Sequence, residues 1–238
     1  MTPSEILRRY YSLHSRIYDA TRWSFLFGRE HLLREWSGRI SPARIVEIGC
    51  GTGVNLSRMG RLFPDARLVG IDTSAEMLAV ARRRLRSLGN RVEWHERYYH
   101  SPGGLNPAPD LVCFSYCLSM INPGVEAVVA AVEADLAPGG YVAVVDFHGS
   151  RHRWFRHWMK MNHVRMEEHL LPLLQERFSC DQCRVDPAYG GLWNYFQFVG
   201  RARPAKSSKA ALTRAACQVR PRLDRPPQAD HFCGRDRA

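Results

Sequence analysis

The sequence has no long apolar run. A helix that crosses a bilayer needs about 20 consecutive apolar residues. The best candidate, residues 111–121, is shorter and includes two serines and a tyrosine. The chain also does not open with a basic segment followed by an apolar one, as a secretory signal peptide does. We therefore expect a cytoplasmic protein without a transmembrane helix.

Patterns that bind metals or form disulfides are also scarce. Cys180 and Cys183 form one CxxC pair, and no second pair follows at the spacing of a zinc finger. Cys50, Cys113 and Cys117 fall at the ends of apolar segments, where cysteine usually acts as a small hydrophobe. The sequence therefore predicts free thiols and no bound metal.

Positive charge is in excess, and it is unevenly distributed. The formal net charge is +11, and residues 202–238 alone hold nine Lys or Arg against three Asp. This segment also has four prolines and no hydrophobic periodicity, so it is predicted to be a disordered tail. Such a tail is either a dispensable solvated extension or a segment that touches nucleic acid or anionic lipid.

Short apolar strands alternate with helices along the chain. Strands are predicted at residues 44–48, 67–71, 92–94, 111–114, 141–145 and 193–199, and helices at 73–88 and 124–136. Thr73 and Glu76 form a capping box at the start of the first helix. This alternation is typical of a parallel sheet with helices on both faces. We predict a doubly wound, mostly parallel, Rossmann-like α/β domain over residues 40–201. A helical cap over residues 1–39 precedes it, and the tail follows.

A glycine-rich turn lies between two carboxylates at the ends of the first two strands. Three glycines, Gly49, Gly51 and Gly53, follow Glu47, and Asp72 ends the second strand. Glycines permit positive φ and let a ligand lie against bare backbone, and ligands of open α/β sheets bind at the carboxyl ends of the strands. We predict that Glu47 neutralises an ammonium group of the ligand. Asp72 is predicted to accept hydrogen bonds from two ribose hydroxyls.

The order strand–Glu–GxGxG–helix–strand–Asp, followed by Leu136-Ala137-Pro138-Gly139-Gly140 before another strand, resembles the class I methyltransferases over about residues 40–147. The resemblance implies that the cofactor is S-adenosylmethionine. The cofactor-binding residues would be Glu47, Gly49, Gly51, Gly53, Asp72, Thr73, Met77, Glu96 and Ser115. Met77 would pack on the adenine, although a plain core role suits it nearly as well, and Ser115 would offer backbone near the sulfonium.

One stretch departs from that family pattern. After the third strand such enzymes carry an acid and a small residue that hold the adenine, whereas this chain has His95-Glu96-Arg97-Tyr98. Either Glu96 serves, or the adenine pocket differs.

Three segments combine aromatic with basic residues, namely residues 4–18, 18–29 and 151–165. Amphipathic stretches of this composition suit the headgroup region of a membrane. The alternative is that the aromatics cap the core of the sheet and the charges are merely solvated.

Two segments resemble the betaine-lipid N-methyltransferases. They are residues 18–29, YDATRWSFLFGR, and residues 115–121, SYCLSMI. The likeness covers about residues 8–201, and residues 122–124 depart from the pattern. It implies trimethylation of the amino group of diacylglyceryl-homoserine to give diacylglyceryl-trimethylhomoserine. Its implied place is the inner face of the membrane, with anionic headgroups as partners.

Direct methyl transfer to an unprotonated amine depends mostly on positioning. A developing quaternary ammonium is best met by aromatic faces. We therefore predict Tyr18 and Tyr116 as ring faces and Asp146 or Asp19 as a nearby charge. Each of these residues also suits a core or capping role.

Three other functions stay open on the sequence alone. Phosphatidylethanolamine is a rival substrate for the same chemistry. A methyltransferase recruited to RNA by the basic tail would lose activity when residues 202–238 are removed; we expect activity to persist and nucleic acid not to be a partner. The third function is that of a binding module without catalytic activity. The intact glycine turn with Glu47 and Asp72 argues against it.

Overall fold

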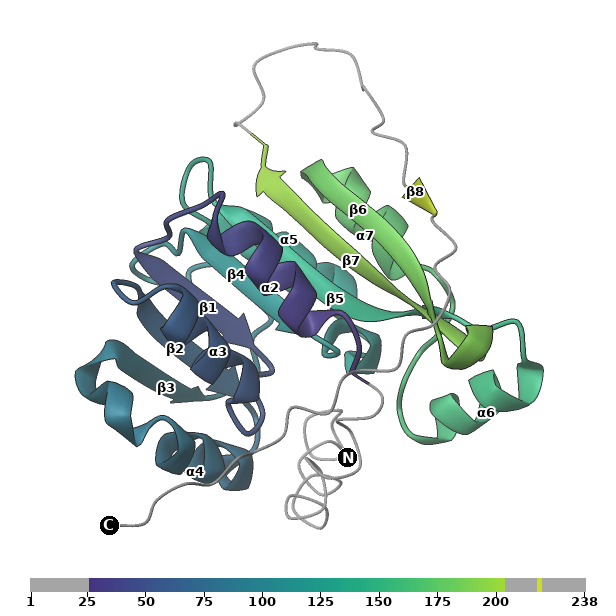
Figure 1. The fold of residues 1–238 in the computed structure, drawn as a ribbon, viewed down its shortest axis with the longest axis horizontal. Helices are drawn as coiled ribbons and strands as arrows, with labels where there is room; N and C mark the ends of the chain where they lie inside the picture. The colour runs from purple at the N-terminus through teal and green to yellow at the C-terminus, as the bar shows by residue number, and fades with distance from the viewer. Residues whose placement is uncertain (1–25, 204–217, 220–238) are drawn as a thin grey trace, which may run out of the picture.

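The computed structural model describes residues 26–203 and 218–219. This part of the chain forms one eight-stranded sheet in the order β3-β2-β1-β4-β5-β7-β6-β8 (Figure 1). The strands are β1 Arg44–Ile48, β2 Arg67–Asp72, β3 Val92–Glu96, β4 Leu111–Ser115, β5 Tyr141–Gly149, β6 Phe178–Ala188, β7 Trp193–Ala202 and β8 Gln218–Val219. Strands β1 to β5 pair in parallel, and β7 runs antiparallel between β5 and β6. The predicted doubly wound, mostly parallel α/β fold is confirmed.

Helices cover both faces of the sheet. They are α2 Arg29–Ser37, α3 Val54–Leu62, α4 Ala75–Arg84, α5 Val125–Asp135, α6 Arg153–Met161 and α7 Leu170–Arg177, with 3-10 turns η2 Arg86–Arg91, η3 Leu118–Met120 and η4 Tyr189–Gly191. Side chains from α2, α3 and α4 share one core cluster, and those from α5 and α7 share the other. Figure 1 shows α2 and α3 in front of the sheet and α5 behind it.

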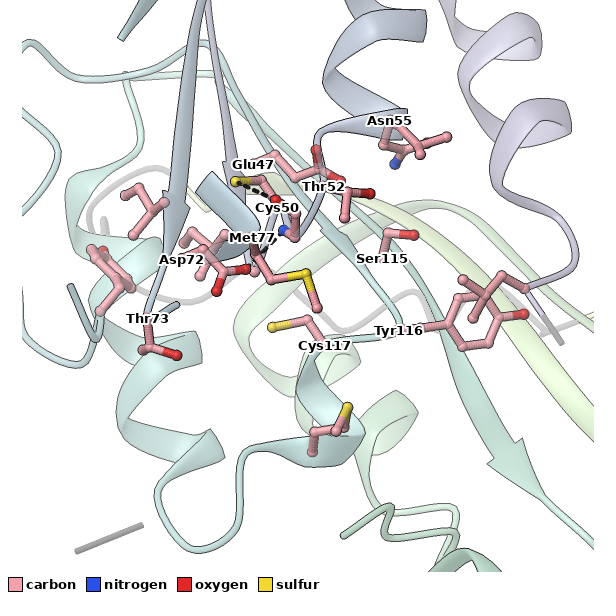
Figure 2. A pocket seen from close by; sticks show the side chains of 18 of the residues that line it. Glu47, Cys50, Thr52, Asn55, Asp72, Thr73, Met77, Ser115, Tyr116 and Cys117 are labelled. Atoms are coloured by element: carbon pink, nitrogen blue, oxygen red, sulfur yellow. Dashed lines mark hydrogen bonds between the residues drawn. The ribbon is translucent and has the colours of Figure 1, made fainter. Parts of the chain in front are cut away.

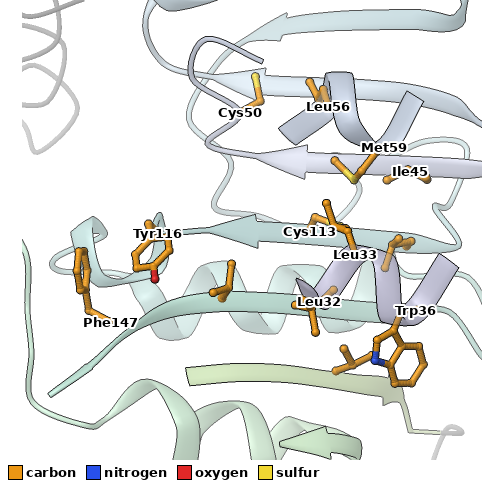
Figure 3. Close-up of a cluster of buried hydrophobic side chains, with 14 of the residues drawn as sticks. Leu32, Leu33, Trp36, Ile45, Cys50, Leu56, Met59, Cys113, Tyr116 and Phe147 are labelled. Atoms are coloured by element: carbon orange, nitrogen blue, oxygen red, sulfur yellow. The ribbon is translucent and has the colours of Figure 1, made fainter. Parts of the chain in front are cut away.

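The strands contribute side chains to both core clusters, because successive side chains of a strand point to opposite faces of the sheet. In β1, Ile45 packs with the α2–α3 cluster and its neighbour Val46 with the α5–α7 cluster. Figure 3 shows Met59 of α3 beside Ile45, and Leu33 of α2 near Cys113. Burial of each such side chain stabilises the fold by roughly 1.5–3 kcal/mol.

The strand order reverses at the centre of the sheet. From β1 the chain proceeds outward through β2 and β3, and then returns to place β4 on the other side of β1. In open α/β sheets such a switch point leaves a crevice at the carboxyl ends of the two central strands. Here the glycine turn follows β1, and Tyr116 and Cys117 follow Ser115 at the end of β4, so both segments border that crevice.

The first residue of α4 differs from the prediction. Ser74, not Thr73, is the N-cap, since its Oγ accepts a hydrogen bond from the Met77 backbone N–H at 3.2 Å. The reason lies in Asp72, whose carboxylate accepts from the Ser74 N–H at 3.0 Å and so holds Ser74 extended, outside the helix.

The edge beyond β5 was only partly predicted. The β7 strand and the amphipathic helix α6 fall within the predicted segments, whereas β6 and α7 had no prediction. Gln218 and Val219 pair with β6 inside the segment predicted as a tail.

Residues 1–25 and most of that tail lie outside the described residues, so the boundaries at 39/40 and 201/202 stay predictions. No helix among the described residues is long and apolar enough to span a membrane.

Candidate active site

The glycine turn after β1 folds tightly against β2 and α4. Gly49, Gly51 and Gly53 all have positive φ, at 72°, 53° and 74°, which other residues rarely adopt. The Gly49 and Cys50 N–H groups both donate to the Ile71 carbonyl, at 2.8 and 3.1 Å. A Cβ on Gly49 would lie 2.4 Å from Cys117 Sγ. The turn therefore needs glycine for its backbone conformation and for its close approach to residue 117.

Asp72 connects this turn to the start of α4. Its carboxylate accepts hydrogen bonds from the Gly51 N–H at 2.7 Å and the Ser74 N–H at 3.0 Å. Burial raises its pKa, and these backbone donors act against that shift. Each carboxylate oxygen has more than one acceptor position, so Asp72 can still accept from ligand hydroxyls.

Glu47 is a buried carboxylate at the base of the turn, with 1% of its surface exposed. Burial raises its pKa to about 8, against a hydrogen bond from Asn55 and the charge of Arg29. Among the described residues nothing donates to its Oε2 atom. Because a buried acceptor without a donor is costly, this carboxylate fits a ligand that brings an ammonium group.

One cavity of about 290 Å³ joins these groups. Of the predicted cofactor-binding residues, Glu47, Gly49, Gly51, Asp72, Thr73, Met77 and Ser115 line it. Figure 2 shows Asp72 and Met77 gathered near Cys117. The buried Ser115 Oγ is a second acceptor in this wall with no partner among the described residues. Glu47 and Asp72 thus share one cavity, as S-adenosylmethionine would require of them.

The other two predicted cofactor residues lie outside the cavity wall. Gly53 is the N-cap of α3, and a Cβ there would come within 3.0 Å of Ala81. Glu96 is exposed at the end of β3, and the cavity is lined there by Arg97, Tyr98 and Tyr99 instead. This arrangement favours an adenine pocket that differs from the family pattern, which was the second of the two alternatives. A contact between Glu96 and the adenine stays a prediction.

The predicted catalytic residues have three different positions. Tyr18 lies outside the described residues, as does Asp19. Tyr116 lines the cavity and donates its hydroxyl to the Phe27 carbonyl at 2.9 Å. Asp146 is fully buried and is absent from the cavity lining. It accepts from the Ser119 and Phe147 N–H groups at 3.1 and 2.7 Å, and burial raises its pKa to about 6. A catalytic role for these residues stays a prediction.

Four arginines also line the cavity, and none of them was predicted as a site residue. They are Arg29, Arg58, Arg84 and Arg97. Arg84 donates to the Thr52 carbonyl and hydroxyl at 2.5 and 2.8 Å and so supports the glycine turn. Arg29, at the start of α2, lies close enough to act on the charge of Glu47. A cation beside Glu47 suits a ligand that carries a carboxylate next to its ammonium.

Comparison with known proteins supports this assignment of the cavity. Residues 45–140 match the family model described as a methyltransferase domain. A trans-aconitate 2-methyltransferase of Variovorax paradoxus is 37% identical over 102 residues, which are 43% of this chain and 38% of that enzyme. The chain thus spans about two fifths of the length of the curated relatives it matches.

Solved structures show the same fold at low sequence identity. The N-methyltransferase NodS from Bradyrhizobium japonicum, in complex with S-adenosylhomocysteine, has a TM-score of 0.61 and 19% identity, covering 74% of this chain and 86% of its own. Phosphoethanolamine N-methyltransferase 2 of Haemonchus contortus has a TM-score of 0.64 and 16% identity, covering 86% and 61%. The prediction of S-adenosylmethionine as the cofactor is confirmed, and residues 45–140 are similar to a methyltransferase domain.

Proposed function

We propose that this protein is an N-methyltransferase that trimethylates the amino group of diacylglyceryl-homoserine. The observation that carries the proposal is the position of Tyr116 in the cavity wall. Its hydroxyl is committed to the Phe27 carbonyl at 2.9 Å, so the ring is what it can offer to a ligand. A ring attracts a quaternary ammonium without needing a hydrogen bond from it, as the third methylation requires.

The cofactor contributes one thing to this chemistry, an electrophilic methyl group on a sulfonium. The chain's own residues supply binding and orientation. Glu47 and Arg29 suit the ammonium and carboxylate of the amino-acid end, and Asp72 suits the ribose hydroxyls. Burial raises the pKa of Tyr116 well above its ordinary value, so its phenol stays protonated and is no base. The amine must therefore enter the cavity already neutral, or lose its proton to another group.

Two structural neighbours support nitrogen as the methylated atom, because both are named N-methyltransferases. The curated relatives instead favour a second candidate, transfer to a carboxylate of a small acid such as trans-aconitate. The arginines in the cavity wall suit that substrate as well. Phosphatidylethanolamine remains the rival lipid.

The test is to incubate the purified chain and labelled S-adenosylmethionine with diacylglyceryl-homoserine, phosphatidylethanolamine or trans-aconitate. The masses of the products are then determined by mass spectrometry. We expect the homoserine lipid to gain three methyl groups. In that assay Tyr116→Leu should accumulate the dimethyl product, whereas Tyr116→Phe, which keeps the ring, should complete the series. Label found only in trans-aconitate would replace the proposal with the second candidate, and label only in phosphatidylethanolamine would replace the lipid.

Binding of the amino-acid end is expected to depend on pH through Glu47. Its pKa is about 8 in the folded protein, so below that pH the carboxyl must lose a proton before it can pair with an ammonium. Affinity for S-adenosylhomocysteine should therefore rise by up to about tenfold per pH unit from about pH 6, and level off near pH 8. Above pH 8 the ligand's own amino group loses its charge.

Calorimetry at several pH values measures this dependence, and buffers of different ionisation enthalpy report the proton released. Glu47→Gln cannot ionise and should give a weaker, flat profile. A wild-type profile as flat as that of the variant would show that Glu47 does not pair with the ammonium.

A further inference from the structure

One face of helix α6 packs against the core of the domain. Phe155 stacks on Trp193 with ring centroids 5.3 Å apart and an interplanar angle of 12°. Phe155 and Met159 are the buried residues of this helix. Figure 1 shows α6 at the margin of the molecule, beyond the carboxyl end of β5. Other side chains of the helix are more exposed than these two.

A second face of α6 exposes large apolar side chains. Trp154, Trp158 and Met161 are 64%, 46% and 70% exposed. Their spacing of four and three residues places them in one row along the helix, here named the apolar stripe. With Tyr189 of η4 they are the exposed large hydrophobic side chains of the described residues. Exposed tryptophans in a row are uncommon on a surface that meets only water.

A third face of α6 is basic. Arg153, His157 and Lys160 repeat the same spacing and form a parallel row, here named the basic stripe. This row borders a groove of about 910 Å³. Four cationic side chains line the groove, Arg153, Arg156, Lys160 and Arg165. The one carboxylate in that lining, Glu167, pairs with Arg165 at 2.6 Å. The groove therefore carries a net positive charge.

The groove adjoins the candidate active site. Met120 lines both the groove and the cofactor cavity. Trp154 of the apolar stripe also lines the groove. The apolar stripe therefore borders the basic groove, and the basic groove borders the cavity that Tyr116 lines.

We propose that α6 docks the protein onto an anionic lipid bilayer, with the apolar stripe in the headgroup boundary and the basic groove facing anionic headgroups. Tryptophan and lysine or arginine on one helix are the features that hold an amphipathic helix in that boundary. A second copy of the chain fits less well, because it would bring two basic faces together. This inference rests on the proposed function, because docking serves to let a lipid substrate pass from the membrane into the cofactor cavity, which Met120 borders.

Flotation of the full chain with vesicles tests the docking without any methyl transfer. The vesicles contain phosphatidylcholine alone or phosphatidylcholine with phosphatidylglycerol, and neither lipid has a primary amine. We expect binding to the phosphatidylglycerol vesicles and release by salt. Trp154→Ser with Trp158→Ser should weaken binding about tenfold or more, and Arg153→Gln with Lys160→Gln about fivefold for each charge.

Matched variants control for charge and for tryptophan itself. Arg82→Gln with Arg83→Gln removes the same charge from exposed positions on α4 and should bind like the wild type. Trp154→Phe with Trp158→Phe keeps the stripe apolar and should retain most of the binding. No binding by the wild type, or equal binding by the serine variant, would overturn the docking proposal. So would dimerisation in sedimentation that the serine variant abolishes. Vesicle binding without any lipid methylation would overturn the proposed function alone.

Discussion

We expect Asp72→Ala to weaken the binding of S-adenosylhomocysteine by about 2–4 kcal/mol, on the scale of charge-assisted hydrogen bonds. This corresponds to a rise in Kd of roughly 30- to 800-fold. The ligand has the same amino-acid and ribose ends as the methyl donor. The variant loses the acceptor for the ribose hydroxyls and also the acceptor for the Gly51 and Ser74 N–H groups. Calorimetry measures the change.

Asp110→Ala is the matched control for this loss. Its carboxylate also accepts from two backbone N–H groups, those of Ala43 and Arg44, both at 2.9 Å. It is absent from the cavity lining, so its removal should affect stability and leave the Kd unchanged. A deoxyribose analogue of the ligand should bind the wild type more weakly and should show little further loss with Asp72→Ala. An unchanged Kd for Asp72→Ala would mean that the ribose lies elsewhere.

Gly49→Ala should lower the free energy of unfolding by about 2–5 kcal/mol. The left-handed backbone at φ 72° costs any other residue about 1–2 kcal/mol. The new Cβ would also lie 2.4 Å from Cys117 Sγ and 3.0 Å from Cys117 Cβ, and overpacking of this kind costs roughly 1–3 kcal/mol. Urea denaturation followed by circular dichroism measures the change.

Gly38→Ala is the control, because its φ is −87° and an added Cβ has nothing within 4 Å. Its stability should stay close to that of the wild type. Cys117→Ala in the Gly49→Ala background removes the nearer of the two clashing atoms and should restore part of the loss. If Gly49→Ala and Gly38→Ala were equally stable, the close packing of the turn on residue 117 would be wrong.

The parallel half of the sheet was predictable because its signals are local. Buried parallel strands are continuous apolar runs. A carboxylate also marks the ends of two of them, Glu47 next to the last residue of β1 and Asp72 as the last residue of β2. The order of segments then fixes which strand ends meet. The cofactor cavity follows from that order with little help from long-range packing.

The remaining parts depend on tertiary contacts that a linear pattern does not carry. Strand β6 has polar residues through its middle, DQCR, and owes its conformation to pairing with β7. The charge of Arg29 acts on Glu47 because α2 packs on α3 and so places Arg29 near the glycine turn. Ser74 takes the cap position from Thr73 because Asp72 engages its N–H. Helix α6 was predicted as amphipathic, but which of its faces is exposed depends on the stacking of Phe155 on Trp193.

Glu47 and Asp72 form the central pair of this site, and we infer that they bind opposite ends of a single methyl donor. Calorimetric titration of the full chain with S-adenosylhomocysteine at pH 8, beside Asp72→Ala and Glu47→Gln, tests this directly. We expect one ligand per wild-type chain and weaker binding by each variant. Absence of binding by the wild type, or binding that neither substitution changes, would contradict this placement of the methyl donor.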